Sequence, residues 1–295
     1  MEQARKLKKL KGLQENHILA PYTSFKIGGP AKYFFVAERN SDIIKAVKLA
    51  RESQIDYFIL GNGSNILISD LGFDGLVIKM ENNKIDFNEN IVTAESGVKV
   101  QKLIRETISR NLSGLEHLIG IPGTVGGGVA GNIGTPNQWI DEHIIDVTIL
   151  DDQGEQIILP KSQCDFSYRY SRFKNNDTEI ILSARFRLLP SSQKIIQQKV
   201  KDFLEKRSHQ PVNQPCAGSI FKNPEGHKAW KLIDEVNMRG KKVGGAKVSE
   251  EHANFIINTG RATAEDVVVL ISLIKQQVRD NLGVQLNEEI KYIGF

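Results

Sequence analysis

Two glycine-rich stretches contain the residues of this chain that are best suited to bind an anion. "GNGSN" occupies residues 61–65 and "GIPGTVGGGVAGN" occupies residues 120–132. Glycine lets backbone N–H groups approach a phosphate without an intervening side chain, and asparagine and serine add donors that tolerate tight turns. Either stretch alone could be an ordinary turn. Because both are flanked by apolar segments, the two together favour a site that grips a diphosphate, such as that of a dinucleotide, from two sides.

The second stretch also contains the pattern G-x-G-x-x-G at Gly126, Gly128 and Gly131. In a Rossmann site this pattern directly follows a strand and opens a long helix. Here Gly120 and Pro122 interrupt any strand before it, and the proline at position 136 limits the helix after it. No Lys-Ser or Lys-Thr follows the glycines, so a P-loop is excluded as well.

Short strands and amphipathic helices must position these stretches. Apolar residues at helical spacing predict helices over residues 41–53, 99–110, 191–207, 227–236 and 263–283. The last of these opens with a capping box at Thr263. Apolar runs between turn residues predict strands over residues 57–60, 66–69, 75–80, 90–96, 183–189 and 253–258, and a hairpin over residues 144–159.

Pro190 interrupts this pattern, and we place a domain boundary there. The residues before it, 1–190, divide into lobes of about 1–82 and 83–190, and residues 191–295 form the second domain. The helix that opens the second domain should bury one apolar face, made of Ile195, Ile196, Val200, Phe203 and Leu204.

Composition excludes several classes of protein. With 295 residues, 40% of them hydrophobic and 25% charged, the chain has ordinary globular values, and no run is long enough to span a bilayer. Cys164 and Cys216 have no metal-ligand spacing, which indicates a reducing compartment and no metal site. The basic N-terminal residues lack a following apolar region, so we expect no secretory signal and a cytoplasmic protein. A net charge of +4 without a concentrated basic surface argues against nucleic acid and membrane partners.

Several motifs, in order along nearly the whole chain, resemble the UDP-N-acetylenolpyruvoylglucosamine reductase (MurB) family. They are "TSFKIGGPAKYF" (23–34), "LGNGSNILISDLGFDGLVIK" (60–79), "GLEHLIGIPGTVGGGVAGNIG" (114–134), "SYRYSRFK" (167–174), "AGSIFKNPEGHKAWKLID" (217–234), "GGAKVSEEHANFIIN" (244–258) and "LNEEIKYIG" (286–294). The resemblance implies an α+β fold. Residues 1–190 would be an FAD-binding domain of the vanillyl-alcohol-oxidase (PCMH) type in two lobes, and residues 191–295 an α+β substrate-binding domain.

The resemblance also implies a reaction and its catalytic residues. The family reduces an enolpyruvyl ether on a UDP-amino sugar, with NADPH as hydride source for a non-covalently bound FAD. Ser219 matches the proton donor, Arg169 matches the arginine that stabilises the substrate carboxylate, and Glu289 matches a glutamate that shares a proton or orients Arg169. Neighbouring carboxylates on a strand point to opposite faces, so only one of Glu288 and Glu289 can face the site.

Binding residues follow from the same matches. We expect FAD to contact the two glycine-rich stretches, through Gly61, Asn62, Gly63, Ser64, Asn65, Gly120, Pro122, Gly123, Thr124, Gly127, Gly128, Ala130 and Asn132. We expect the sugar nucleotide to contact Lys222, Asn223, Arg207, Lys247 and His252.

The chain resembles the short form of the family, because no room remains after Pro190 for the tyrosine-bearing insertion of long members. We expect a monomer. Two alternatives stay open at this stage. One is a sugar or alcohol oxidase on the same flavin fold, which would not need the serine, arginine and glutamate. The other is a non-catalytic flavin-binding scaffold, which is suggested by "NEE" at residues 287–289, where the family more often has "EPE".

Overall fold

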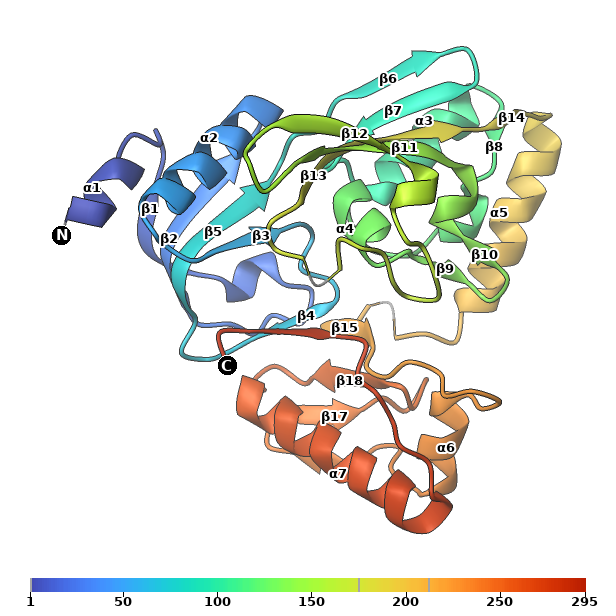
Figure 1. Ribbon diagram of the computed structural model, residues 1–295. Coiled ribbons are helices and arrows are strands. Elements are labelled where there is room, and N and C mark those ends of the chain that lie inside the picture. The colour runs from blue at the N-terminus through green and yellow to red at the C-terminus, as the bar shows by residue number, and fades with distance from the viewer. Residues whose placement is uncertain (1, 175, 212) are drawn as a thin grey trace. The chain divides into compact units, whose positions relative to one another are not determined.

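The computed structural model describes residues 2–174, 176–211 and 213–295 (Figure 1). These residues fall into two compact units, each assembled from separate stretches of chain. Unit 1 comprises the chain up to Gln14 together with Phe34–Asn62 and Gly75–Ser208, and unit 2 comprises Glu15–Tyr33, Gly63–Asp74 and His209–Phe295.

Unit 1 contains most of the sheet structure. Its helices are α1 (Glu2–Leu7), α2 (Asn40–Glu52), α3 (Val100–Ser109), η2 (Glu116–Leu118), α4 (Val125–Ala130), η3 (Ile140–His143), η4 (Lys161–Gln163) and α5 (Gln193–Arg207). Its strands are β3 (Tyr57–Leu60), β6 (Ile85–Asn88), β7 (Ile91–Glu95), β8 (Leu112–Ser113), β9 (Gly134–Thr135), β10 (Gln138–Trp139), β11 (Ile144–Leu150), β12 (Gln156–Pro160), β13 (Ile180–Arg187) and β14 (Leu189–Pro190). Strands β1 (Gln14–Ile18), β2 (Pro30–Ala37) and β5 (Phe73–Met80) join β3 in a sheet of order β1-β2-β5-β3.

The second sheet has the order β12-β11-β13-β7-β6 and is antiparallel throughout. The predicted hairpin is confirmed, because β11 and β12 pair in register from Leu150 opposite Gln156 to Asp146 opposite Pro160. Alternation on β13 exposes Arg185 and buries Phe186, as a strand with one face in the core requires. Helix α3 presents its apolar face to the same core.

Helix α5 forms where the sequence predicts it, but only part of its apolar side is buried, with Val200 and Phe203 partly covered. Ile196 is fully buried, whereas Ile195 is 53% exposed and Leu204 is 48% exposed. The helix also belongs to the same compact unit as the residues before Pro190. Pro190 itself pairs with Leu112 in the short β14–β8 ladder, so it ends an edge pairing within unit 1 and does not mark where the compact unit ends.

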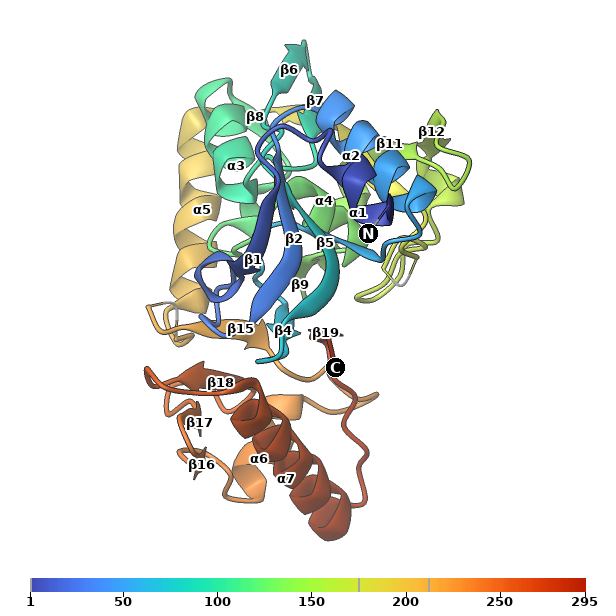
Figure 2. The same cartoon turned by 90° about the vertical axis from the view of Figure 1, so that its left-hand side faces the viewer.

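Unit 2 is a smaller α/β assembly. Its elements are η1 (Ala20–Tyr22), β4 (Ile66–Ile68), β15 (Cys216–Ser219), α6 (Ala229–Glu235), β16 (Lys242–Val243), β17 (Ala246–Val248), β18 (Phe255–Asn258), α7 (Ala264–Leu282) and β19 (Lys291–Ile293). Strands β15, β18, β17 and β16 form one sheet in that order, and α6 and α7 lie against it in both views (Figures 1 and 2). Strand β19 pairs in parallel with β4.

The core of unit 2 contains residues from all three of its stretches of chain. Phe25, Leu67, Ile256 and Leu270 belong to one buried cluster. The apolar segments 15–33 and 63–74 are therefore needed to complete the core of the C-terminal part of the chain. Within the described part of the chain, no helix combines the length and apolarity that crossing a membrane requires.

Both predicted ends of helix α7 are confirmed. Thr263 Oγ1 accepts a hydrogen bond from the Asp266 amide at 3.0 Å, and Asp266 Oδ2 accepts one from the Thr263 amide at 3.1 Å. Gly283 ends the helix in the left-handed region with φ +68°. The Asp266 carboxylate accepts hydrogen bonds from the backbone amides of Gly245 and Thr263, which lower the pKa of Asp266.

Removing this cap should destabilise the protein measurably. We expect Thr263→Ala to lower the free energy of unfolding by about 1 kcal/mol, because the Asp266 amide then loses its acceptor at the helix start. Urea unfolding followed by circular dichroism measures the change. Thr263→Ser keeps the hydroxyl and is the control. Equal losses in both variants would contradict the assignment of the effect to the cap.

Candidate functional site

The first glycine-rich stretch runs from one compact unit into the other. Gly61 and Asn62 belong to unit 1, and Gly63, Ser64 and Asn65 belong to unit 2. In unit 1, a Cβ atom added to Gly61 would lie 2.7 Å from Thr124 Oγ1, in the second glycine-rich stretch. The two stretches therefore meet within unit 1, as a site that grips one ligand from two sides requires.

The half of this stretch in unit 2 is tied to chain segments that carry predicted catalytic residues. Gly63 has φ +62°, and its carbonyl accepts hydrogen bonds from the amide and hydroxyl of Ser24 at 3.0 and 3.2 Å. The Ser24 hydroxyl also lies 2.6 Å from the carbonyl of Cys216 on β15. Asn65 Nδ2 donates to the Glu289 carbonyl at 3.2 Å. The loop thus connects β15 with the segment of Glu289.

The second stretch folds as a loop followed by the short helix α4. Thr124 is its N-cap, and the Thr124 hydroxyl accepts a hydrogen bond from the Gly127 amide at 3.4 Å. No strand directly precedes the helix, which has 6 residues. The exclusion of a Rossmann site is therefore confirmed. Before the helix, Gly120 has φ +80°, Pro122 is exposed, and the Gly123 carbonyl accepts from the Val100 amide at 3.0 Å.

The three consecutive glycines of α4 have different surroundings. A Cβ at Gly126 would lie 2.8 Å from Ser96 Cβ, and one at Gly128 would lie 2.9 Å from Ile133 Cδ1, so packing inside the protein explains both. Gly127 is exposed, and a Cβ there would meet only Thr124 Oγ1, at 3.6 Å. Nothing in the described protein requires glycine at position 127. A ligand that lies against this backbone would require it, so the loop fits the dinucleotide expected there.

Two other residues that were expected to contact the cofactor bind the protein itself. Asn132 is 2% exposed, and its Nδ2 donates to the Ser167 carbonyl at 3.0 Å. The Ala130 carbonyl accepts from the Ser171 hydroxyl at 2.8 Å. Both contacts hold the segment that contains Arg169. Sequence reasoning missed this role, because nothing in the local pattern links residues 130–132 to residues 167–171.

Arg169 lies at the tip of a tight turn. Ser167 and Tyr170 exchange two backbone hydrogen bonds of 3.1 Å, and Arg169 between them has φ +55°. Its Nη1 donates to the Gly134 carbonyl at 3.4 Å, and its guanidinium carbon lies 5.4 Å from the ring centroid of Trp139. Non-glycine residues rarely adopt this backbone conformation, and they cluster at functional sites where it occurs. Sequence reasoning missed Trp139 for want of any local signal.

A second arginine lies near Arg169 in unit 1. Arg207, at the end of α5, donates from Nη2 to the His117 carbonyl at 3.3 Å and lies beside Gly120. Its Nε is buried and has no hydrogen-bond acceptor among the described residues. Burial and the charge of Arg169 both lower the pKa of Arg207. Two guanidinium groups that repel each other in a partly buried place favour binding of an anion there.

Ser219 and Glu289 lie on adjacent segments of unit 2. Ser219 ends β15, opposite Phe255 on β18, and the Glu289 amide donates to the carbonyl of the next residue, Ile220, at 2.7 Å. The carboxylate of Glu288 accepts from Lys275 Nζ on α7 at 2.8 Å. This ion pair supports the expectation that Glu288 faces α7 and that Glu289 is the carboxylate left for the site.

The residues expected to bind the sugar nucleotide are divided between the two units. Arg207 belongs to unit 1, and the other four belong to unit 2. The Lys222 amide donates to the Asn287 carbonyl at 2.8 Å, which fixes the loop after Ser219 beside the Glu289 segment. Asn223 Oδ1 accepts from the Ala229 amide at 3.0 Å and so holds the start of α6.

Lys247 and His252 have different surroundings. Lys247 Nζ forms an ion pair with Glu250, at 2.7 Å from its Oε1. His252 is half-buried, with its ring 4.9 Å from that of Phe255 and 6.0 Å from that of Trp230. Burial and the charge of Arg239 lower the pKa of His252, so it is a neutral hydrogen-bonding group at neutral pH. Among the described residues, no His, Cys, Asp and Glu side chains form a group of three that could hold a metal ion.

Comparison with known proteins identifies relatives over almost the whole chain. Residues 31–159 match a family described as an FAD binding domain, and residues 210–293 match "UDP-N-acetylenolpyruvoylglucosamine reductase, C-terminal domain". Two curated relatives carry the name UDP-N-acetylenolpyruvoylglucosamine reductase. The one from Carboxydothermus hydrogenoformans is 42% identical over 95% of this chain and 93% of its own, and the one from Clostridium novyi is 38% identical over 96% and 92%.

A solved structure confirms the fold. The crystal structure of UDP-N-acetylenolpyruvylglucosamine reductase (MurB) from Thermus caldophilus matches with a TM-score of 0.82 at 32% identity, covering 94% of this chain and 97% of that one. Together with the FAD binding domain match, it confirms the α+β fold class that the sequence motifs indicated.

The surroundings of Gly127 predict a selective loss of FAD binding. We expect Gly127→Ala to weaken FAD affinity about tenfold or more, because the added methyl group occupies space beside the loop backbone. The unfolding temperature of the apo-protein should not fall, since alanine favours a helix more than glycine does. Flavin fluorescence titration measures the affinity. Gly128→Ala, which overlaps Ile133, should instead lower stability. Unchanged FAD affinity in Gly127→Ala would contradict the assigned contact.

His117 predicts a loss of stability in acid. It is 3% exposed, and burial together with the charge of His143 lowers its pKa from 6.5 to about 4. Between these values the unfolded chain binds a proton that the folded protein does not, so stability falls as pH drops from 6.5 toward 4. The full loss amounts to about 3 kcal/mol. Denaturant unfolding across this range should show a shallower loss for His117→Phe than for wild type, while His209→Gln, at an exposed position, should follow wild type.

Proposed function

The chain belongs to the UDP-N-acetylenolpyruvoylglucosamine reductase family, and we propose how its own residues divide the reaction of that family. The protein reduces UDP-N-acetylglucosamine enolpyruvate to UDP-N-acetylmuramate in peptidoglycan precursor synthesis, with FAD as cofactor and NADPH as reductant. When bound, FAD would supply the hydride, taken from NADPH, that is added to the terminal vinyl carbon of the substrate. We assign the cofactor to the residues before Pro190 and the sugar nucleotide to the residues after it, although helix α5 belongs to the same compact unit as the former.

The observation that carries the residue assignments is the juxtaposition of β15 with the Glu289 segment in unit 2. Ser219 ends that strand, and the Glu289 amide is hydrogen-bonded to the carbonyl of Ile220. Adding hydride to a double bond conjugated with a carboxylate leaves a carbon that must gain a proton. The Ser219 hydroxyl donates that proton, because a carbanion-like carbon is basic enough to take it from a weak acid.

Arg169 stabilises the negative charge that develops on the substrate carboxylate. Its guanidinium is always charged, and its planar fork matches a carboxylate with two hydrogen bonds. Glu289 orients this arginine or shares a proton with the reacting group. The ion pair between Glu288 and Lys275 supports Glu289, because it leaves the neighbouring carboxylate occupied elsewhere.

The remaining predicted residues bind FAD or the sugar nucleotide. The two glycine-rich stretches hold the diphosphate of FAD, with Gly127 as the position whose surroundings best support contact. Arg207 and Lys247 provide positive charge for the sugar nucleotide, and Lys222, Asn223 and neutral His252 provide hydrogen bonds. The protein acts as a monomer in the cytoplasm, without nucleic acid or membrane partners, and its two free cysteines suit a reducing compartment.

A single-turnover experiment tests this proposal. The protein is reduced with NADPH without oxygen, the enolpyruvyl sugar nucleotide is added, and flavin absorbance is followed. We expect Ser219→Ala to reoxidise about 10²-fold to 10⁴-fold more slowly than wild type, the range for loss of a general acid, with unchanged reduction by NADPH. Ser219→Cys keeps a proton donor and should retain part of the rate.

Other outcomes would contradict the proposal in distinct ways. Wild-type reoxidation rates in Ser219→Ala would exclude Ser219 as the proton donor. Reoxidation by oxygen but not by the sugar would favour the oxidase alternative, since an oxidase does not need the serine. Flavin binding without any turnover would favour the scaffold.

A further inference from the structure

The turn that presents Arg169 needs support from outside itself. An arginine with φ +55° occupies a conformation that costs free energy and persists only where neighbouring contacts hold it. Two backbone hydrogen bonds between Ser167 and Tyr170 close the turn, but they do not fix its position against the rest of unit 1. The contacts of the residues on either side therefore decide where the guanidinium points.

On one side the turn is bound to the end of α4. Asn132 donates to the Ser167 carbonyl at 3.0 Å, and the Ser171 hydroxyl donates to the Ala130 carbonyl at 2.8 Å. Asn132 and Ser171 are both buried, so these hydrogen bonds are protected from water. They fix the base of the turn but leave the chain beyond Ser171 to be held by something else.

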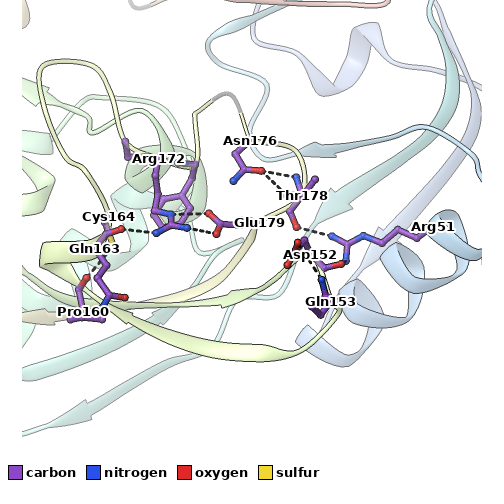
Figure 3. A network of polar contacts seen from close by, with 12 residues as sticks. Arg51, Asp152, Gln153, Pro160, Gln163, Cys164, Arg172, Asn176, Thr178 and Glu179 are labelled. Carbon is purple, nitrogen blue, oxygen red and sulfur yellow. Dashed lines mark hydrogen bonds and ion pairs between the residues drawn. The ribbon is translucent and has the colours of Figure 1, made fainter.

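On the C-terminal side of the turn, Arg172 joins the chain before the turn to Glu179 after it (Figure 3). Its Nε lies 2.9 Å from Glu179 Oε2, its Nη2 lies 2.5 Å from Glu179 Oε1, and its Nη1 donates to the Gln163 carbonyl at 3.0 Å. The Arg172 amide donates to the Cys164 carbonyl at 3.0 Å. The Arg172 side chain thus binds Gln163, which precedes the turn, and Glu179, which follows it.

The residues just before Glu179 are held by hydrogen bonds from other parts of unit 1. Arg51 on α2 donates to the Thr178 carbonyl at 2.7 Å and to the Asp152 carbonyl at 3.0 Å (Figure 3). The Tyr57 hydroxyl donates to the Asp177 carbonyl at 2.9 Å. Because Arg51 and Tyr57 hold the chain just before Glu179, the carboxylate that Arg172 binds is anchored to the helix and sheet of unit 1.

We propose that Arg172 is a positioning residue for Arg169. Its two-point ion pair with Glu179, together with Asn132, holds the turn so that the Arg169 guanidinium is aimed at the substrate carboxylate. This inference rests on the role proposed for Arg169 above.

A positioning role and a purely structural role predict different results. The Arg172 side chain is 34% exposed and that of Glu179 is 12% exposed, so removing the arginine leaves a mostly buried carboxylate without its partner. Both roles therefore predict some loss of stability, and the reaction rate is the readout that separates them. A displacement of about 1 Å in a group that contacts the reacting atoms can cost 10²-fold in rate.

The chain offers a matched control. Arg185 on β13 and Asp146 on β11 form an ion pair with side-chain exposures of 44% and 7%. This pair also bridges segments of unit 1, through three contacts from Arg185 to the Asp146 carboxylate, but it connects the adjacent strands β11 and β13 and not the two flanks of the turn. Arg185→Gln thus removes a comparable ion pair without releasing the turn.

The test uses the holoenzyme and single-turnover reoxidation by the enolpyruvyl sugar nucleotide. We expect Arg172→Gln and Glu179→Gln to slow reoxidation about tenfold to 100-fold. Reduction of the flavin by NADPH should stay unchanged, and any fall in the unfolding temperature should be similar to that of Arg185→Gln. The double variant should be no slower than either single variant, because both remove one interaction. The exchange Arg172→Glu with Glu179→Arg should recover part of the rate, and Arg185→Gln should match wild type.

Three outcomes would overturn the inference. The first is a wild-type reoxidation rate in Arg172→Gln, with Arg169→Ala strongly impaired; this leaves the proposed function intact. The second is an equal loss in Arg185→Gln, which would indicate a general effect on the fold. The third is a wild-type rate in Arg169→Ala itself, which removes the proposed role of Arg169 and the positioning role of Arg172 together.

Discussion

The arrangement of unit 1 depends on holding an arginine in a backbone conformation that arginine disfavours. Arg169 has φ +55° at the tip of a turn, and the end of α4, the β9–β10 hairpin and the Arg172–Glu179 pair all contact that turn or its flanks. Each contact satisfies a polar group that would otherwise lack a hydrogen-bond partner, such as the buried side-chain amide of Asn132. Strain at the turn is therefore offset by satisfied polar groups around it.

The second glycine-rich stretch consequently has two roles, cofactor contact and support of the Arg169 turn, at positions only a few residues apart. Gly127 faces outward with room beside its backbone, whereas Ala130 and Asn132 face the Arg169 turn. The first stretch is divided in a similar way, because Gly61 lies against Thr124 in unit 1 while Asn65 is bonded to the Glu289 carbonyl in unit 2. In each glycine-rich stretch, residues expected to contact the cofactor thus lie a few positions along the chain from residues that bind the segment of a proposed catalytic residue.

Local patterns in the sequence were sufficient for the longer helices and for several strands, but not for others such as β2, nor for the grouping of the elements. The capping box at Thr263 and the β11–β12 hairpin were predictable, because neighbouring residues determine both. Burial of one face of α5 was not, since it depends on what the rest of unit 1 offers to that helix. Likewise, nothing near Phe25 or Leu67 indicates that they complete a core with Leu270. That contact is set by tertiary packing across distant parts of the chain.

The same limit applies to the site. Composition identified both glycine-rich stretches, but it could not tell a glycine required by packing, such as Gly128, from one with free space beside it. Ser219, Arg169 and Glu289 were assigned only by resemblance to a family, because a serine after glycine or an arginine among aromatic residues has no chemical signature of its own. Trp139 and Arg172 were missed, since their importance lies in contacts with Arg169 or its turn.

Electrostatic repulsion explains why a neutral histidine, His117, suits the region of Arg169 and Arg207. Burial, and after it the charge of Arg169, lower the pKa of Arg207, so the two positive charges oppose each other. His117, whose carbonyl binds Arg207, is kept neutral by burial, with its pKa lowered to about 4. A protonated His117 would add a third positive charge to the same partly buried region, at further cost to folding. Burial thus keeps His117 from adding a further positive charge beside the two guanidinium groups, and a bound anion relieves their mutual repulsion directly.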